Sequence, residues 1–599
     1  MLLNLFDWSI VVLFFILSLI IGLIVTKRAG SSTVEFFAVG KTMPWWLLGI
    51  SLVATTFSTD TPNLVTDIVR NNGVAGNWVW FAFLITGIVT VFIYAKMWRR
   101  SNVLTDIEFY EIRYSGKAAA FLRGFRAIYL GVFFNLMIMA SVSLAAIKIG
   151  SVLLNVSPTL TIVVAGTIVV IYSILGGLMG VLLTDLFQFF IAMAGSVIVA
   201  VVAIGLPKVG GLSNLLAHPA VKGKLSILPN FSNTDLVMTI FIIPLAVQWW
   251  AAWYPGAEPG GGGYVAQRMF AAKNEKHAIG STLFFNFAHY ALRPWPWILV
   301  ALASLVVFPD LASIKTAFPQ IPADKLGHDL AYPAMVTFLP HGALGMVVAS
   351  LAAAYMSTIS THLNWGSSYV VNDFYKRFIK KGASEKELVK VGRISTFLLM
   401  LFSSLIALLL TNALQAFQIV LQVGAGTGLL FILRWFWWRI NAISEIAAMI
   451  VSFFVAMYFE FIHPHIFGPI QDWKKFIIGV AITTCGWLIA TFVTKPTDSE
   501  TLIKFYRLIK PGGPGWKNFL AREARQREDL QELTSTVSSW DVPSGLLCVF
   551  LGCLGIYGAL FGIGFLIYSN IIGAVICLSA AVFASIGLIK NWSKLKVAI

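Results

Sequence analysis

An apolar segment over residues 45–69 contains, near its centre, Ser51-Leu52-Val53-Ala54-Thr55-Thr56-Phe57-Ser58-Thr59-Asp60-Thr61-Pro62. Polar side chains and a proline are unusual in the middle of such a segment. Irregular backbone inside a membrane occurs only where protein or a water-filled cavity surrounds it, because an unsatisfied peptide group in lipid costs several kcal/mol. The stretch therefore predicts a membrane helix that is interrupted beside a cavity.

A second interrupted segment begins near Leu236 and extends to Tyr254. It contains Pro244 and Gln248 and continues into a Pro/Gly-rich run over residues 255–263, which lacks the Gly-Lys-Ser/Thr ending of a phosphate-binding loop. Two interrupted segments five helices apart suggest inverted repeats. Transporters built in this way bind substrate and coupling ion near the middle of the bilayer, where the unwound segments meet.

The composition indicates a polytopic membrane protein rather than a soluble one. The chain has 599 residues, of which 58% are hydrophobic and 12% charged, and its mean hydropathy is +0.82. Apolar windows long enough to cross the hydrocarbon core recur about fifteen times. We expect a single all-α membrane domain over residues 1–599. No nucleophile–base pair or zinc motif occurs in the predicted spans, so we do not expect an enzyme.

Basic residues predict the orientation. The first span, residues 8–26, has no basic residue before it and is followed by Lys27-Arg28, so we interpret it as an uncleaved helix. Under the positive-inside rule the N-terminus lies outside and the C-terminus in the cytoplasm of a cell membrane, which we expect to be a bacterial inner membrane. The net charge of +16 then reflects orientation and anionic lipid, not nucleic acid. The connections used for this assignment are Trp98-Arg99-Arg100, Gln267-Arg268, Lys376-Arg377 with Lys380-Lys381, and Lys590-Asn591.

Four hydroxyl side chains and one alanine share one side of a predicted helix. At about 100° per residue, Ala354, Ser357, Thr358, Ser360 and Thr361 fall within less than half a turn. A single hydroxyl in a membrane helix commonly bonds its own backbone. Four of them on one face favour a cation site.

Asp185 is a carboxylate within a predicted span, where such a group is costly and is usually paired or functional. A purely structural role, as a hydrogen-bonding group at a helix end, remains the alternative. The four cysteines, Cys485, Cys548, Cys553 and Cys577, lie in predicted spans and have no metal-binding or redox spacing.

Several short motifs occur in an order that resembles the solute:sodium symporter family, whose members include bacterial sodium/galactose, sodium/proline and sodium/sialic acid transporters. The motifs are Glu35 to Lys41 with Pro44-Trp45-Trp46, Gly176-Gly177 ahead of Thr184-Asp185 and Gln188, Gln267 to Lys273, the hydroxyl segment through Asn364, and Gln415-Ala416-Phe417-Gln418.

The resemblance implies a LeuT-type fold with a 5+5 inverted-repeat core. The core would cover residues 44–435, with one extra helix before it at residues 8–27. Extra helices would follow at residues 442–495 and 544–590. Between them, residues 496–543 mix aromatic residues with charges of both signs and predict a cytoplasmic interfacial segment.

The resemblance also implies the coupling ion, Na+, and its ligands. The main sodium site would use the backbone carbonyls of Ala54, Phe57 and Ala354 with the hydroxyls of Ser357 and Thr358. Five uncharged oxygens suit a monovalent cation. A second site, as in some members, would combine Asp185 with the hydroxyls of Ser357, Ser360 and Thr361.

Candidate substrate contacts are Asp60, Thr61, Trp80, His289, Arg293 and Gln422. The sodium/galactose symporter has a glutamine, a glutamate and a lysine where this chain has Thr61, Trp80 and His289. The family's aromatic gate is replaced by the Pro/Gly run. Galactose is therefore not implied.

We accordingly expect a sodium-coupled symporter, monomeric or weakly oligomeric, that imports a small polar organic solute such as a sugar or sugar acid by alternating access. An amino acid or a monocarboxylate is the alternative solute. An uncoupled channel or a membrane sensor is the alternative of another class.

Overall fold

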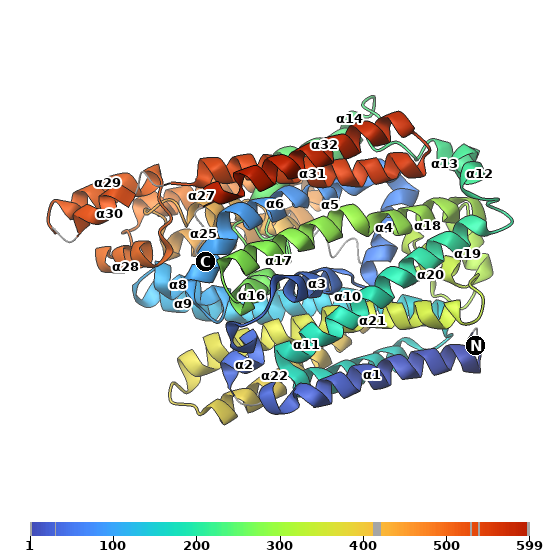
Figure 1. Cartoon of the computed structure of the whole chain (residues 1–599), viewed down its shortest axis with the longest axis horizontal. Coiled ribbons are helices and arrows are strands. Elements are labelled where there is room, and N and C mark those ends of the chain that lie inside the picture. Colours follow the sequence, from blue (N-terminus) through green and yellow to red (C-terminus); the bar gives the residue numbers. More distant parts are fainter. Residues whose placement is uncertain (1–2, 30–31, 411–420, 528–529, 537–539, 596–599) are drawn as a thin grey trace.

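The computed structural model describes residues 3–29, 32–410, 421–527, 530–536 and 540–595. These residues form helices and no β-strand, which confirms the all-α prediction. Most helices run along the long axis of the molecule (Figure 1). Helix α1, Leu5–Ala29, lies along one side, and the helices α31, Val542–Ile567, and α32, Ile571–Asn591, lie along the opposite side.

Eleven helical stretches among the described residues are long and apolar enough to cross a membrane. Two shorter apolar helices, Leu5–Ile21 and Trp45–Thr56, add to them. The polytopic prediction is confirmed, while the number of about fifteen spans stays a prediction. The eleven are Val74–Ser101, Gly116–Leu153, Pro158–Gly205, Thr234–Ala251, Glu275–Val307, Ala343–Ile379, Glu385–Leu409, Ala442–Phe467, Asp472–Val493, Val542–Ile567 and Ile571–Asn591.

The longest of these, α11, covers Pro158–Gly205 and is bent at Gly177. Forty-eight residues would extend roughly 70 Å as one straight helix, more than twice the thickness of the hydrocarbon core. Gly177 has φ 51° and ψ −155°, which are not helical values. The helix therefore consists of two segments joined at the Gly176-Gly177 motif.

Both predicted interruptions are present. In the first, α3, Trp45–Thr56, and α4, Asp60–Asn72, are separated by residues 57–59. In the second, α14, Thr234–Val237, continues through π-helical turns to α15, Trp249–Ala251, and residues 252–262 then lead into α16, Gly263–Ala271. Glycines with positive φ, among them Gly260 and Gly261, allow the second connection to turn.

The remaining helices complete the molecule. Helix α21, Ala343–Ser368, packs extensively against α11 and also contacts α3. The others are α2, Thr33–Ala38; α5, Trp78–Phe81; α6, Phe83–Val89; α7, Ala95–Ser101; α8, Phe109–Arg113; α9, Gly116–Ile128; α10, Asn135–Leu153; α12, Leu212–Ala217; α13, Pro219–Lys222; α17, Glu275–Phe287; α18, Pro294–Val307; α19, Leu311–Ala317; α20, Ala331–Val336; α22, Glu385–Leu409; α24, Gly428–Leu433; α25, Ala442–Met457; α26, His463–Phe467; and α27, Asp472–Val493.

The segment expected to be interfacial contains three helices: α28, Ser499–Ile509; α29, Pro514–Ala524; and α30, Gln531–Thr536. They lie at the end of the molecule opposite to α12, α13 and α19 (Figure 1). Many apolar side chains of α28 and α29 are buried, among them Phe505, Trp516 and Phe519, and the Trp516 Nε1 donates a hydrogen bond to the carbonyl of Trp435 at 3.0 Å. This segment packs against the rest of the protein.

Candidate functional site

The hydroxyl face of α21 lies against the end of α3, where the main sodium site is predicted. The Thr358 Oγ1 is 2.7 Å from the carbonyl oxygen of Thr55 and 3.1 Å from that of Ala354. The carbonyl of Ala54, one residue before Thr55, accepts a hydrogen bond from the Phe57 amide at 3.0 Å. The Thr358 hydroxyl and the carbonyls of Thr55 and Ala354 thus meet at the end of α3, and such uncharged oxygens fit a monovalent cation. The sodium ligands themselves stay a prediction.

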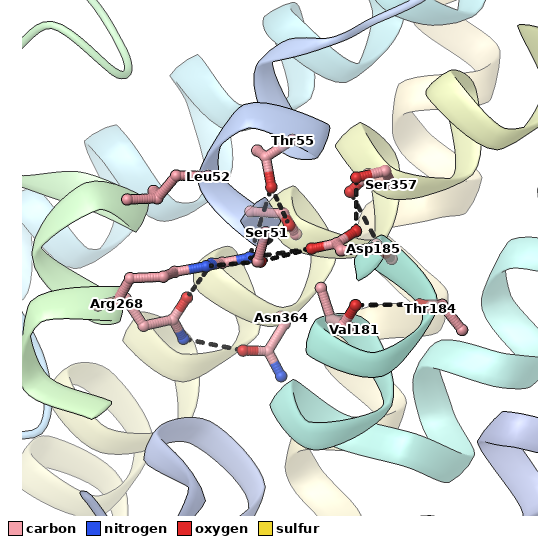
Figure 2. A network of polar contacts seen from close by, with 12 residues as sticks. Ser51, Leu52, Thr55, Val181, Thr184, Asp185, Arg268, Ser357 and Asn364 are labelled. Carbon is pink, nitrogen blue, oxygen red and sulfur yellow. Dashed lines mark hydrogen bonds and ion pairs between the residues drawn. The ribbon is translucent and has the colours of Figure 1, made fainter. Parts of the chain in front are cut away.

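The Ser357 hydroxyl points to Asp185 of α11 (Figure 2). The Ser357 Oγ donates to Asp185 Oδ1 at 2.5 Å, and the Ser51 Oγ of α3 donates to Asp185 Oδ2 at 2.5 Å. Asp185 is fully buried. The carboxylate therefore links α3, α11 and α21, and it lies within α11 rather than at a helix end.

Arg268 completes this network. The prediction that Gln267-Arg268 belongs to a basic connection is wrong, because Arg268 lies in α16 and is fully buried. The side of the membrane on which it lies stays a prediction. Its Nη2 donates to Thr361 Oγ1 at 2.7 Å and to Ser51 Oγ at 3.2 Å, and lies 3.9 Å from Asp185 Oδ2. Figure 2 shows the guanidinium pointing toward Ser51 and Asp185.

The residues of the second predicted sodium site are close together, but their hydroxyls already form hydrogen bonds within the protein. Thr361 Oγ1 is 2.9 Å from Thr55 Oγ1 besides its bond to Arg268, and Ser360 Oγ donates to the carbonyl of Ser357 at 3.1 Å. In this conformation the guanidinium of Arg268 provides the positive charge beside Asp185. A second sodium ion at Asp185 stays a prediction, and it would have to compete with Arg268.

A cavity of about 150 Å³ adjoins the main site, between the two interrupted helices. Five of the six predicted substrate contacts line it: Asp60, Thr61, Trp80, His289 and Arg293. The rings of Tyr254, Tyr264 and Tyr290 line it too, as does Thr358, which belongs to the predicted sodium site.

Arg293 and His289 form a hydrogen-bonded unit at the wall of this cavity. Arg293 Nη2 and His289 Nε2 are 3.0 Å apart, and His289 Nδ1 is 3.0 Å from Thr56 Oγ1. Because arginine can only donate, His289 Nε2 accepts, and the imidazole is neutral with its proton on Nδ1. Arg293 also donates to Thr56 at 3.1 Å, and its guanidinium lies 5.3 Å from the Trp297 ring centre.

Gln422 lies elsewhere. Its Nε2 donates to the carbonyl of Lys475 at 3.3 Å, and it lines a different cavity with Asp67, Gln248 and Trp473. Its role as a substrate contact stays a prediction, and we leave it out of the central site. The motif over residues 415–418 lies outside the described residues.

A sequence model of the sodium:solute symporter family matches residues 36–452. The chain belongs to this family. It is 28% identical over 451 residues to a sodium/glucose cotransporter of Vibrio parahaemolyticus, covering 73% of this chain and 81% of that protein. It is 25% identical over 603 residues to sodium/glucose cotransporter 1 of Oryctolagus cuniculus, covering 90% of this chain and 86% of that protein.

A solved structure supports the fold. A Na+-coupled sialic acid symporter in a substrate-bound outward-open state aligns with a TM-score of 0.65 at 20% identity, covering 83% of this chain and 99% of that one. The chain is therefore a multi-pass membrane transporter with a LeuT-type fold. Sodium is its coupling ion, as membership of the family implies.

Proposed function

We propose that this symporter imports a small polyhydroxylated solute, such as a sugar, cyclic polyol or sugar acid, together with sodium by alternating access. The observation that carries the proposal is the position of Thr358. Its side chain lies with the carbonyls of Thr55 and Ala354 and also lines the central cavity, so the ion and the solute would bind next to each other.

The lining of the cavity supports a polyhydroxylated solute. Tyrosine and tryptophan rings offer flat apolar surfaces, while Asp60 can accept hydrogen bonds from solute hydroxyls and Thr61 can donate or accept them. Trp80 lies with its ring centre 5.8 Å from that of Tyr290 in a stacked arrangement. This mixture suits a ring with many hydroxyl groups. Because the guanidinium of Arg293 can pair with a carboxylate, the cavity also suits a solute that carries one, such as a sugar acid.

Sodium binding would act on the first interruption. A cation that shares the carbonyls of Ala54 and Phe57 with the hydroxyls of α21 would hold the end of α3 against α21. The cavity between the two interrupted helices would then already be formed when the solute binds. The membrane potential would drive the movement of charge with about 2.3 kcal/mol per charge per 100 mV.

Replacing Thr358 by valine tests the sodium role. Valine keeps the shape of the side chain and removes one ligand oxygen, so sodium activation of uptake should weaken about tenfold, since a bond to a charged group contributes roughly 1.5 kcal/mol. Serine at the same position keeps the oxygen and should retain most of the activation. Equal sodium dependence of both variants and the wild type would contradict the assignment.

A solute panel tests the rest of the proposal. Proteoliposomes with an inward sodium gradient would receive labelled glucose, mannose, myo-inositol, sialic acid, an amino acid or a monocarboxylate. We expect one polyhydroxylated compound to accumulate above its external concentration, and only with sodium. An uncoupled channel would only equilibrate the compound. Accumulation of the amino acid or monocarboxylate alone would contradict the proposed solute class.

A further inference from the structure

The connection between α15 and α16 carries a buried carboxyl that the sodium and solute sites do not use. Glu258 is only 4% exposed. Its Oε2 accepts a hydrogen bond from the Gly256 amide at 3.2 Å, and its Oε1 has no hydrogen-bond partner. Pro255, Gly256 and Ala257, just before it in the chain, line the solute cavity.

A second carboxyl lies beside Glu258. The Asp106 Oδ2 accepts a hydrogen bond from the Gly263 amide at 2.9 Å, and the Tyr369 hydroxyl donates to its Oδ1. A Cβ atom added at Gly262 would lie 3.4 Å from Asp106 Oδ2 and 3.5 Å from Glu258 Cγ. The two acidic side chains therefore flank the same glycine.

Neither carboxyl forms an ion pair with a basic side chain of the described residues. Arg126 of α9 faces the pair, but its guanidinium lies 4.9 Å from the Phe431 ring centre and donates to the Met449 sulfur. Arg434 is paired with Glu445 at 3.3 Å. Besides these two arginines, the tyrosines Tyr264 and Tyr369 face the pair. The titratable and charged groups around Glu258 and Asp106 are therefore Arg126, Arg434, Tyr264 and Tyr369.

An ionised carboxylate without a cation is costly inside a protein, and two adjacent carboxyls disfavour a second negative charge. Asp106 already receives two hydrogen bonds that stabilise its ionised form, whereas Glu258 receives one and leaves one oxygen unpaired. Of the two side chains, Glu258 is therefore the one that holds a proton in this conformation.

We propose that Glu258 is a proton-binding site in the second interrupted helix, and that sodium binding releases its proton to the water of the solute cavity. In this step the carboxylic acid of Glu258 becomes a carboxylate and one proton passes to water. The inference rests on the proposed function, because it requires sodium to bind beside Asp185 or at the adjoining main site.

The helix α16 provides the mechanical link. Gly263 at its start contacts Asp106, and Arg268 near its end contacts Ser51 and Thr361 beside Asp185. A sodium ion at this cluster repels the buried guanidinium. Because a nine-residue helix moves as a unit, a displacement of Arg268 also moves Gly263 and the connection that covers Glu258. Water then reaches the carboxyl and it ionises.

Proton release can be measured on the purified full-length protein. Sodium chloride would be added to a weakly buffered solution with a pH indicator at pH 7, with choline chloride as the reference. The wild type should release up to about one proton per molecule. Glu258→Gln should release none while its stabilisation by sodium in thermal unfolding remains. Glu275→Gln is the control, because Glu275 is another buried glutamate and is paired with Arg100. This variant should release as many protons as the wild type.

The outcomes separate this inference from the proposed function. A wild type that is stabilised by sodium but releases no proton would overturn the inference, and so would a Glu258→Gln variant that releases as many protons as the wild type. Absence of sodium stabilisation would instead contradict the proposed function. If Glu258→Gln fails to fold, infrared spectroscopy of the wild type replaces this comparison. The band of the protonated carboxyl group should decrease when sodium is added. A constant band would overturn the inference.

Discussion

Arg268 connects the elements of the candidate sodium site. It is a fully buried cation that contacts the first interrupted helix through Ser51 and the hydroxyl face of α21 through Thr361. Its Nη1 also donates to Gln267 Oε1 at 2.9 Å, and Gln267 in turn donates to Asn364 at 2.8 Å. One side chain therefore joins the second interrupted helix to both elements that would hold sodium.

Replacing Arg268 by glutamine should destabilise the protein by about 3 kcal/mol, because it leaves the buried carboxylate of Asp185 without a cation. Sodium-driven uptake should be lost as well. Thermal unfolding in detergent measures the first effect. The double variant with Asp185→Asn should recover part of the stability, since the unpaired charge is then removed.

Lys380→Gln serves as the control for this change. Lys380 pairs with Glu387 at 2.8 Å, but the two side chains are 55% and 27% exposed, so solvent screens the pair and the loss of stability should be small. An Arg268→Gln variant that unfolds at the wild-type temperature would contradict the importance given to the buried pair.

At the scale of helices, local sequence features predicted the two interruptions and the hydroxyl face. Polar residues, proline and glycine within apolar segments are visible without knowledge of the fold. The role of Arg268 was missed because α16 has only nine residues after a glycine run, so no long apolar window includes it and the arginine resembled a loop residue. Glu258 was missed for the same reason. Spacing also could not show which of two cavities Gln422 lines, since this depends on how distant helices pack.

Gly177 determines the path of α11, and alanine at this position should destabilise the protein by about 1–3 kcal/mol. The φ angle of 51° disfavours a side chain, and a Cβ atom would lie 2.8 Å from the carbonyl oxygen of Phe36. Gly205→Ala is the matched control, because a Cβ there meets no atom within 4 Å and φ is not positive. Equal unfolding temperatures for the two variants would show that the bend tolerates a side chain.

At the scale of the whole molecule, helices outside the predicted 5+5 core, residues 44–435, contact helices within it through specific hydrogen bonds. On one side, Asp7 of α1 accepts hydrogen bonds from the Gly342 and Gly345 amides at the start of α21, at 2.6 and 3.0 Å. On the other side, the Tyr557 hydroxyl of α31 donates to the carbonyl of Phe81 at 2.8 Å. We infer that each outer helix moves with the core helix it contacts during transport.

The orientation of the molecule remains a prediction, and cysteine labelling in intact cells would test it. The four natural cysteines lie in α27, α31 and α32, so a cysteine-free background changes only membrane helices. Asn230 and Lys381 are both exposed, the first in the connection after α13 and the second between α21 and α22. Lys381 belongs to a basic cluster with Lys376, Arg377 and Lys380, which the positive-inside rule assigns to the cytoplasm.

Asn230→Cys should therefore react with an impermeant maleimide in intact cells, and Lys381→Cys only after permeabilisation. The reverse pattern would mean that the predicted orientation is wrong.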